Sequence, residues 1–180
     1  MTIRSATVRD AAQLADIYRW YVERTAISFE YDPPTAEEFE GRIAWTLERY
    51  PWLVLEDEGQ IRGYAYAGVF KARRAYDRSC ELSIYVERHA HGLGYGRALY
   101  AELERRLSGM GMTNLYACIT DPIVEDETLT RQSEGFHRHL GFETVGRFHR
   151  CGYKFGRWYN LIWMAKLIGE NAPFAPGAIE

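Results

Sequence analysis

The sequence predicts an α/β fold, and three observations lead to this class. Segments with the two-residue periodicity of strands alternate along the chain with segments that have the three- and four-residue periodicity of helices. The chain has 180 residues, 47% hydrophobic and 26% charged, which suits one globular domain with a sizeable core. No linker, repeat or low-complexity tract divides it. We therefore expect a single domain over residues 1–170 and a loose tail over residues 171–180.

A short strand over residues 3–8 and two helices are expected at the start of the chain. Asp10 can cap the first helix. After Asp10, apolar side chains recur at helical spacing, at Leu14, Ile17, Tyr18 and Tyr21. Thr35 and Glu38 have the spacing of a capping box, which predicts the start of the second helix. Pro51 is expected to end that helix.

The rest of the chain reads as strands with two further helices. Residues 52–56 and 61–69 are expected to form a hairpin, because Gly59 in the connection can adopt a positive φ. A strand over residues 81–86 then leads through a glycine-rich turn into a helix with one apolar stripe, Leu99, Leu103, Leu107 and Met110. The remaining elements are a strand at 115–120, an acidic loop at 121–130, a helix at 133–140 that Gly141 ends, and strands at 142–148 and 158–167.

The most informative segment is the glycine-rich turn, H-G-L-G-Y-G, at residues 91–96. Its three glycines lie between a strand and a helix, so main-chain N–H groups can approach an anion closely. Arg97 follows the last glycine, so the turn lacks the Gly-Lys-Ser/Thr of a nucleotide P-loop, and the spacing of a dinucleotide fingerprint is missing as well. A pyrophosphate is the expected ligand, although glycines also occur where a helix starts without any ligand.

The turn resembles the Arg/Gln-x-x-Gly-x-Gly/Ala signature of the GNAT acyl-CoA N-acyltransferases, with His91 in the first position. Other segments resemble the phosphinothricin N-acetyltransferase family, and together they cover nearly the whole chain: I-Y-R-W-Y-V-E, S-F-E-Y-D-P-P-T, R-Y-P-W-L-V-L-E, G-Y-A-Y-A-G, K-A-R-R-A-Y-D, E-L-S-I-Y-V, F-H-R-H-L-G-F and C-G-Y-K-F-G-R-W-Y-N. This resemblance implies the GNAT fold, a mixed and mostly antiparallel sheet flanked by helices. It also implies that two central strands are splayed where pantetheine inserts.

The resemblance implies acetyl-CoA as the co-substrate. It places the cofactor contacts at the end of the central strand, in the turn, and near the last helix, at Ile84, Tyr85, Val86, His91, Gly92, Leu93, Gly94, Tyr95, Gly96, Arg97, Thr130 and Ser133. The N–H groups near Tyr85 and Val86 are expected to stabilise the oxyanion. Thr130 stands where an asparagine is common in the family, and Asn160 stands where an aspartate is frequent.

Acyl transfer to an amine needs a base, because free amines are mostly protonated near pH 7. The resemblance places Glu81 at the position of the general base, acting directly or through one water. The alternative is an ordinary strand carboxylate that faces solvent. His137 stands where many of these enzymes carry a tyrosine, so it is the expected proton donor to the CoA thiolate. The alternative for this histidine is a packing role.

The acceptor is expected to contact two segments that resemble acceptor-site stretches of the family. These segments supply Phe29, Glu30, Arg73 and Tyr76. Arg73 could hold a carboxylate through two hydrogen bonds, whereas Lys71 and Arg74 are interpreted as solvated loop charges.

The implied activity is acetylation of the amino group of a small amino acid or analogue, such as phosphinothricin, methionine sulfoximine or methionine sulfone. The alternatives are a non-catalytic acyl-CoA-binding module and an acetyltransferase for a polyamine or a protein N-terminus. A polyamine or protein N-terminus would favour an acidic pocket.

The composition argues against nucleic acid and membranes as partners. The net charge of −3 and the pI near 6.0 give no field that would attract nucleic acid or an anionic membrane. No leader or membrane-spanning run is recognised, so a cytoplasmic location is expected. Cys80, Cys118 and Cys151 are expected to be buried thiols, and neither they nor the paired histidines have metal-site spacing. A homodimer is implied only by the family resemblance.

Overall fold

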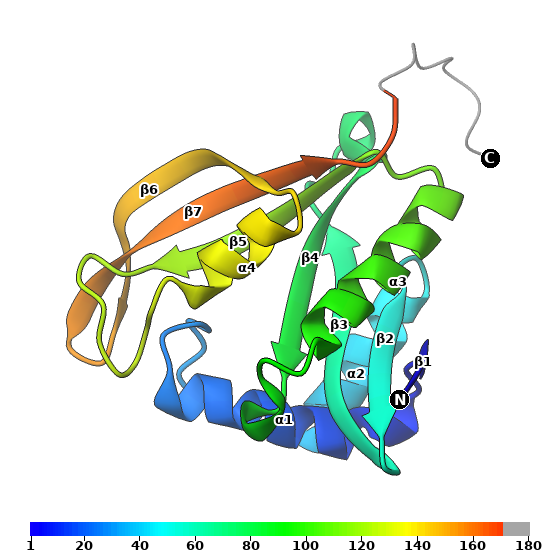
Figure 1. The fold of residues 1–180 in the computed structure, drawn as a ribbon, viewed down its shortest axis with the longest axis horizontal. Coiled ribbons are helices and arrows are strands. Elements are labelled where there is room, and N and C mark those ends of the chain that lie inside the picture. Colours follow the sequence, from blue (N-terminus) through cyan, green and yellow to red (C-terminus); the bar gives the residue numbers. More distant parts are fainter. Residues whose placement is uncertain (171–180) are drawn as a thin grey trace.

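The computed structural model describes residues 1–170 and contains, over that range, a seven-stranded sheet in the order β1-β2-β3-β4-β5-β7-β6 (Figure 1). The strands are β1 (Thr2–Ser5), β2 (Trp52–Asp57), β3 (Gln60–Val69), β4 (Ser79–Val86), β5 (Asn114–Asp121), β6 (Glu143–Lys154) and β7 (Arg157–Leu167). Only the β4–β5 pair is parallel among the ladders of the described chain. The predicted α/β class and mostly antiparallel sheet are confirmed. The expected loose tail at 171–180 lies outside the described residues.

Helices cover both faces of the sheet. They are α1 (Ala11–Arg24), α2 (Ala36–Leu47), α3 (Tyr95–Gly109) and α4 (Gln132–His139). The side chains of β2 alternate between two cores, because successive residues of a strand point to opposite faces. Leu53 and Leu55 pack in one core with the apolar stripe of α3, and Trp52 and Val54 pack in the other with α1 and α2. Figure 1 shows α3 and α4 in front of the sheet.

The capping box at the start of α2 is confirmed. Thr35 Oγ1 accepts a hydrogen bond from the N–H of Glu38 at 3.1 Å, and Glu38 Oε2 accepts one from the N–H of Thr35 at 2.7 Å. The helix ends at Leu47, however, four residues before the Pro51 that was expected to end it. Local pairs of this kind are visible in sequence because both partners lie within one helical turn.

The first strand is shorter than predicted, because residues 8–10 form a 3-10 turn. Asp10 does precede α1, but its carboxylate does not cap that helix. It accepts hydrogen bonds from the Arg4 guanidinium at 2.8 Å and from the N–H of Thr7 at 2.7 Å. Its role is therefore to hold β1 against the 3-10 turn.

Two hairpins have two-residue turns with positive φ at both positions. The β2–β3 turn has Glu58 at φ 51° and Gly59 at φ 74°, which confirms the predicted hairpin. The β6–β7 turn has Phe155 at φ 48° and Gly156 at φ 75°. The second half of β6 was missed in the sequence, because a register shift between Phe148 and Gly152 interrupts the two-residue alternation.

The sheet opens between its two central strands. The parallel β4–β5 ladder begins with Ser79 opposite Asn114 and stops with Leu82 opposite Ala117. Beyond it, residues 83–86 of β4 pair with β3, and residues 118–121 of β5 pair with β7. Figure 1 shows β5 and β7 diverging from β4 toward one end. The splay that the family resemblance implied is therefore present.

Candidate active site

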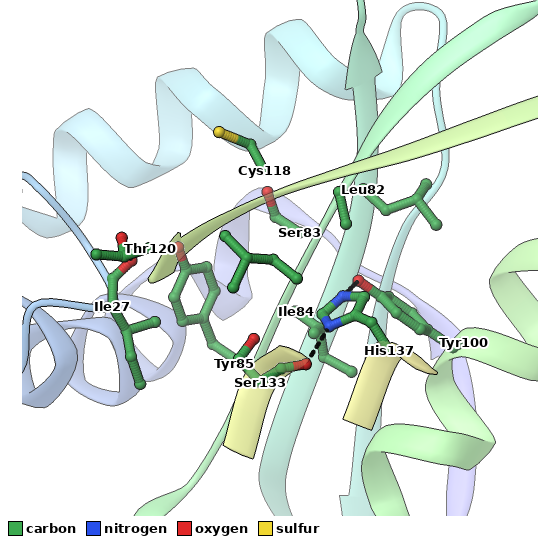
Figure 2. A pocket seen from close by; sticks show the side chains of 12 residues that line it. Ile27, Leu82, Ser83, Ile84, Tyr85, Tyr100, Cys118, Thr120, Ser133 and His137 are labelled. Carbon is green, nitrogen blue, oxygen red and sulfur yellow. Dashed lines mark hydrogen bonds between the residues drawn. The ribbon is translucent and has the colours of Figure 1, made fainter. Parts of the chain in front are cut away.

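A cavity lies at the split between β4 and β5 (Figure 2). Its lining comes from the diverging ends of both strands, from α3 and α4, and from the loop after α1: Ile27, Leu82, Ser83, Ile84, Tyr85, Tyr100, Ala117, Cys118, Ile119, Thr120, Ser133 and His137. Four residues predicted from the sequence, Ile84, Tyr85, Ser133 and His137, are thus brought together here, whereas Thr130, Arg73 and Tyr76 do not line the cavity.

The edge of β4 directs alternate main-chain groups into the split. The N–H of Glu87 donates to the carbonyl of Arg62 on β3 at 2.7 Å. Because main-chain groups alternate sides along an antiparallel strand, those of Tyr85 also face β3, and those of Ile84 and Val86 face the split. Of the N–H groups near Tyr85 and Val86 that were expected to stabilise the oxyanion, that of Tyr85 is therefore directed to β3, and those that face the split belong to its two neighbours.

Tyr21 of α1 holds the end of this edge. Its hydroxyl donates to the carbonyl of Val86 and accepts from the N–H of Val86 at 3.3 Å. His91 Nε2 lies 2.9 Å from the same hydroxyl and 3.1 Å from the same carbonyl. The His91 side chain thus ties the glycine-rich turn to β4 and α1.

The turn has the backbone geometry that requires glycine. Gly92 has φ 82° and Gly94 has φ 84°, and a Cβ at either position would meet no atom within 4 Å. The glycines are therefore present for conformation, on a side of the chain that is open. Helix α3 begins at Tyr95, so the N–H groups of its first turn have no partner within the helix and favour an anion.

Other residues of the turn attach it to the fold. A Cβ on Gly96 would lie 3.1 Å from the Phe136 ring, so this glycine allows α3 and α4 to approach closely. The Tyr95 hydroxyl donates to the Asp57 carboxylate of β2. The side chains of Leu93 and Arg97 are exposed.

Glu81 lies on β4 one residue beyond Cys80 and one before Leu82, both of which are buried in the α3 core. Its side chain therefore projects from the opposite face. Burial raises the pKa of the Glu81 carboxyl, and the Lys71 ammonium partly opposes this rise. A carboxyl with a raised pKa is a stronger base than an exposed one. Glu81 is half-buried, which disfavours the alternative of an ordinary solvated carboxylate.

Lys71 is more closely engaged than the sequence predicted. Its ammonium lies 5.2 Å from the ring centre of Phe70 and 5.7 Å from that of Trp163, within the range of a cation–π contact. It also interacts electrostatically with Glu81. Lys71 is nevertheless exposed in the connection after β3, as the sequence predicted, so its charge is solvated as well as in contact with these rings.

His137 is buried, with both ring nitrogens engaged (Figure 2). Nδ1 lies 2.7 Å from the carbonyl of Ser133, which can only accept, so Nδ1 carries a hydrogen. Nε2 lies 2.9 Å from the Tyr100 hydroxyl and accepts its hydrogen in the neutral imidazole. Burial lowers the pKa of His137, and the bond to Ser133 partly opposes this. A neutral imidazole that accepts at Nε2 is a poor proton donor, so the geometry favours the packing alternative.

The sequence profile that describes the acetyltransferase (GNAT) domain matches residues 3–163 of the chain. The chain belongs to the GNAT acetyltransferase family. Phosphinothricin N-acetyltransferase of Streptomyces viridochromogenes is 36% identical to it, over 97% of this chain and 91% of its own.

Solved GNAT structures share the whole fold. The crystal structure of a GNAT superfamily phosphinothricin acetyltransferase from Sinorhizobium meliloti in complex with AcCoA has a TM-score of 0.87 and 34% identity, and it covers 98% of this chain and 93% of its own. Ribosomal-protein-alanine N-acetyltransferase from Brucella melitensis has a TM-score of 0.81 and 35% identity, and it covers 93% of this chain and 100% of its own.

The expected acceptor residues of this GNAT protein divide into two groups. Both carboxylate oxygens of Glu30 are engaged by Arg42, at 2.8 and 3.0 Å, and one also accepts from Tyr18 at 3.0 Å. The Phe29 ring packs against Tyr159, with 6.2 Å between the ring centres. These two side chains fix their loop to the fold and do not project freely.

Arg73 and Tyr76 of the GNAT chain are exposed. They lie in the connection before β4, where Tyr76 packs edge-on against Phe70. Thr130 is exposed as well, and its hydroxyl accepts from the N–H of Gln132 at 3.4 Å before α4. Arg73 thus has its guanidinium at the surface, where an acceptor carboxylate could reach it.

The cysteines of the GNAT chain differ from one another in burial. Cys80 is buried as expected, Cys118 is half-buried at the cavity, and Cys151 is exposed, so the expectation for Cys151 is wrong. Burial raises the pKa of Cys118 to about 12, and the Glu81 carboxylate adds to this rise. A thiol in this state is a poor nucleophile.

Over residues 1–170, no group of three or more His, Cys, Asp or Glu side chains could hold a metal ion. Among the helices of the same range, none is long and apolar enough to span a bilayer.

Asn160 replaces the aspartate that is frequent in the family, and it contacts the buried Asp121. Asn160 Nδ2 donates to Asp121 Oδ2 at 3.1 Å, and Oδ1 accepts from the N–H of Arg150 at 3.0 Å. Arg131 and Arg147 lie 3.5 and 3.4 Å from the two Asp121 oxygens. Asparagine therefore supplies the donor that a second carboxylate could not.

We expect Asn160→Asp to destabilise the protein by about 1–3 kcal/mol at pH 7, because two carboxylates would then lie side by side. Such a pair binds a proton more tightly in the folded state, so the deficit should shrink as pH falls through the carboxylate range. Urea unfolding at pH 7 and pH 5 measures both effects. The exchanged pair, Asn160→Asp with Asp121→Asn, should recover part of the loss. If Asn160→Asp alone leaves the free energy of unfolding at pH 7 unchanged, the role of Asn160 as the hydrogen-bond donor to Asp121 is contradicted.

Proposed function

We propose that this protein transfers the acetyl group of acetyl-CoA to the α-amino group of a small amino acid or amino-acid analogue. The single observation that carries the proposal is the end of the β4–β5 ladder after Leu82, which opens a main-chain edge that runs from the glycine-rich turn to the residue next to Glu81. Residues 1–170 would act as one domain, in which the sheet holds all parts of the site.

Acetyl-CoA is placed by two sets of main-chain groups. The N–H groups between residues 92 and 97 take the pyrophosphate, with the Arg97 guanidinium available to a phosphate oxygen. The pantetheine arm enters the split along the edge of β4, where the carbonyl of Ile84 can accept from one of its amides. The N–H of Ile84 is the donor that can stabilise the oxyanion, because the N–H of Val86 is already bonded to the Tyr21 hydroxyl.

The chemistry is direct transfer. Glu81 removes a proton from the ammonium form of the acceptor, directly or through one water, and the nitrogen lone pair attacks the thioester carbon. The nitrogen of the tetrahedral intermediate gives up its second proton to solvent, the carbon–sulfur bond breaks, and CoA leaves as a thiolate. Because thiols have a pKa of about 8.5, the thiolate leaves without an obligatory protein acid. This agrees with the neutral, doubly engaged His137.

An acceptor carboxylate is assigned to the connection before β4. Arg73 is exposed there, and Lys71 places an ammonium within electrostatic range of Glu81. A cationic rim of this kind suits an amino acid, whose carboxylate is anionic. It disfavours a polyamine, because like charges would repel. The phosphinothricin N-acetyltransferase of Streptomyces viridochromogenes, at 36% identity, supports the same acceptor class.

A second candidate function is acetylation of a protein N-terminus. It is favoured by the similarity to ribosomal-protein-alanine N-acetyltransferase from Brucella melitensis. A non-catalytic acyl-CoA-binding module is the third, and the half-buried Glu81 argues against it.

Release of free thiol from acetyl-CoA separates these functions. We expect turnover with phosphinothricin, methionine sulfoximine or methionine sulfone, and little with spermidine or an alanine-terminated peptide. Preference for the peptide would favour the second candidate. Acetyl-CoA binding without turnover of any acceptor would overturn the proposal in favour of a binding module.

We also propose a homodimer and a cytoplasmic location. Strand β6 is one of the two edges of the described sheet, and apolar side chains are exposed on the β6–β7 hairpin, at Val145, Phe148, Tyr153 and Trp158. Such a surface suits a second copy of the chain. All three cysteines are free thiols, which fits a reducing compartment. Sedimentation equilibrium tests the dimer.

A further inference from the structure

Lys154, near the end of β6, has a buried ammonium group that the proposed chemistry does not use. The residue is 2% exposed. Nζ donates to the carbonyls of Val22 at 2.7 Å, Thr25 at 3.0 Å and Ser28 at 2.7 Å. An ammonium has three hydrogens, so its donors are fully used. The three carbonyls belong to the last turn of α1 and to the segment that follows it.

Burying this cation is energetically unfavourable. Burial lowers the pKa of Lys154, and Glu30 offsets part of this effect. An apolar side chain of similar size would avoid the desolvation, so a lysine here is not explained by stability alone. What the ammonium supplies is geometry, because it joins β6 to three carbonyls of the last turn of α1 and the segment after it. Two of them lie beyond the last residue of α1, and a cation is favourable at that end of a helix.

The segment that Lys154 holds, residues 25–31, is here called the acceptor loop. It follows α1 and lies beside the β6–β7 hairpin (Figure 1). Ile27 of this loop lines the cavity at the split (Figure 2), and its carbonyl accepts from the Thr120 hydroxyl at 3.4 Å. The loop also contains the two residues that the family resemblance assigned to the acceptor.

A second, independent contact joins the acceptor loop to the same hairpin. The Phe29 ring lies so close to Gly152 of β6 that an added Cβ would be 2.2 Å from a ring carbon. Only glycine leaves room for the ring at this point. The Phe29 ring also packs against Tyr159 of β7. Tyr159 belongs to a small buried cluster with Ala26 and Leu129.

We propose that Lys154 is a positioning residue for the acceptor: its ammonium and the gap at Gly152 fix the acceptor loop on the β6–β7 hairpin at the mouth of the β4–β5 split. This inference rests on the proposed function, since it assumes that the acceptor lies against this loop. Lys154 does not touch the cofactor edge of β4. Its loss therefore alters acceptor binding and leaves acetyl-CoA binding intact.

The test compares Lys154→Met, Lys154→Arg and Gly152→Ala with the wild type. We expect Lys154→Met and Gly152→Ala each to raise the acceptor KM about tenfold or more, because small displacements of a binding group cause large losses. The Kd of acetyl-CoA, measured by calorimetry, should stay within about twofold. Lys154→Arg should recover part of the acceptor affinity, because it keeps a buried donor cation.

Two matched controls lie on the same hairpin. Lys166→Met removes a lysine that pairs with Glu104 at 2.8 Å, away from the acceptor loop, and Gly146→Ala adds a Cβ to β6 where no atom lies within 4 Å. Neither should change the acceptor KM. Amide hydrogen exchange over residues 25–31 gives a readout besides activity, and it should accelerate in Lys154→Met and Gly152→Ala but not in the controls.

The outcomes distinguish the role proposed for Lys154 from the proposed function of the protein. A wild-type acceptor KM in folded Lys154→Met, or unchanged exchange in the loop, would overturn the role of Lys154. An equal loss of acetyl-CoA and acceptor binding would also do so. If Lys154→Met does not fold, Gly152→Ala against Gly146→Ala decides the matter. A wild type that binds acetyl-CoA but turns over no acceptor would defeat the proposed function instead, and hydrogen exchange would still report whether Lys154 holds the loop.

Discussion

Replacing Glu81 by glutamine is expected to lower kcat about 10²- to 10⁴-fold, which is the usual contribution of a positioned general base. Glutamine keeps the size of the side chain and cannot take a proton. The Kd of acetyl-CoA should change little, because the cofactor is assigned to main-chain groups of β4 and of the turn. Steady-state kinetics and calorimetry on the same preparation measure both quantities.

The pH dependence gives a second readout of Glu81. Burial raises the pKa of its carboxyl, with Lys71 in partial opposition, so the base becomes protonated at a pH above that of an exposed glutamate. As pH falls through this raised pKa, kcat/KM should fall. The Glu81→Gln variant should lose this dependence and keep only the rise with pH that the acceptor amine itself causes.

Glu87→Gln is the matched control for this substitution. Glu87 follows the same strand, and its carboxylate is paired with the Arg62 guanidinium at 2.7 Å, so it is not free to act as a base. It should retain wild-type activity. Full activity of Glu81→Gln would show that Glu81 is an ordinary strand carboxylate, and a comparable loss in both variants would show that charge near β4 matters more than a specific base.

The features that the sequence predicted well are those that depend on neighbouring residues. The capping box at Thr35 and Glu38 and the hairpin at Gly59 each involve partners within four residues. The glycine-rich turn belongs to the same class, because a positive φ at Gly92 and Gly94 is a local requirement. Such features need no knowledge of the rest of the fold.

The features that were missed depend on residues far apart in the chain. The split arises because β4 stops pairing with β5, more than thirty residues away, and only the family resemblance pointed to it. The second half of β6 was hidden by its register shift. The contacts of Tyr21 and Lys154 link α1 to Val86 and to β6, and no spacing in the sequence indicates either pair.

His137 makes one contact that the sequence could have predicted and one that it could not. Its bond to the carbonyl of Ser133 spans one helical turn and could have been inferred from helix geometry. Its bond to Tyr100 of α3 could not. The assignment as a proton donor came from position within the family, and position does not reveal that both ring nitrogens are already engaged.

The second large effect is expected at Gly94, where valine should weaken acetyl-CoA binding by about 10- to 100-fold, the size of losing one or two hydrogen bonds to a charged group. Gly94 has φ 84°, a conformation that a β-branched residue adopts only with strain. The turn must therefore relax, and the N–H groups at the start of α3 would no longer converge. Calorimetry with acetyl-CoA measures the loss, and thermal unfolding measures the accompanying destabilisation.

Gly111→Val is the control that separates the backbone strain of valine at a positive φ from the role of Gly94 in acetyl-CoA binding. Gly111 has φ 81° and, like Gly94, open space where a Cβ would lie, but it follows the far end of α3. Both variants should lose a similar amount of stability, because the backbone strain is similar. Only Gly94→Val should lose acetyl-CoA affinity. Equal affinities in the two variants would mean that the N–H groups of the turn do not hold the pyrophosphate, and the cofactor would then have to be anchored by side chains such as that of Arg97.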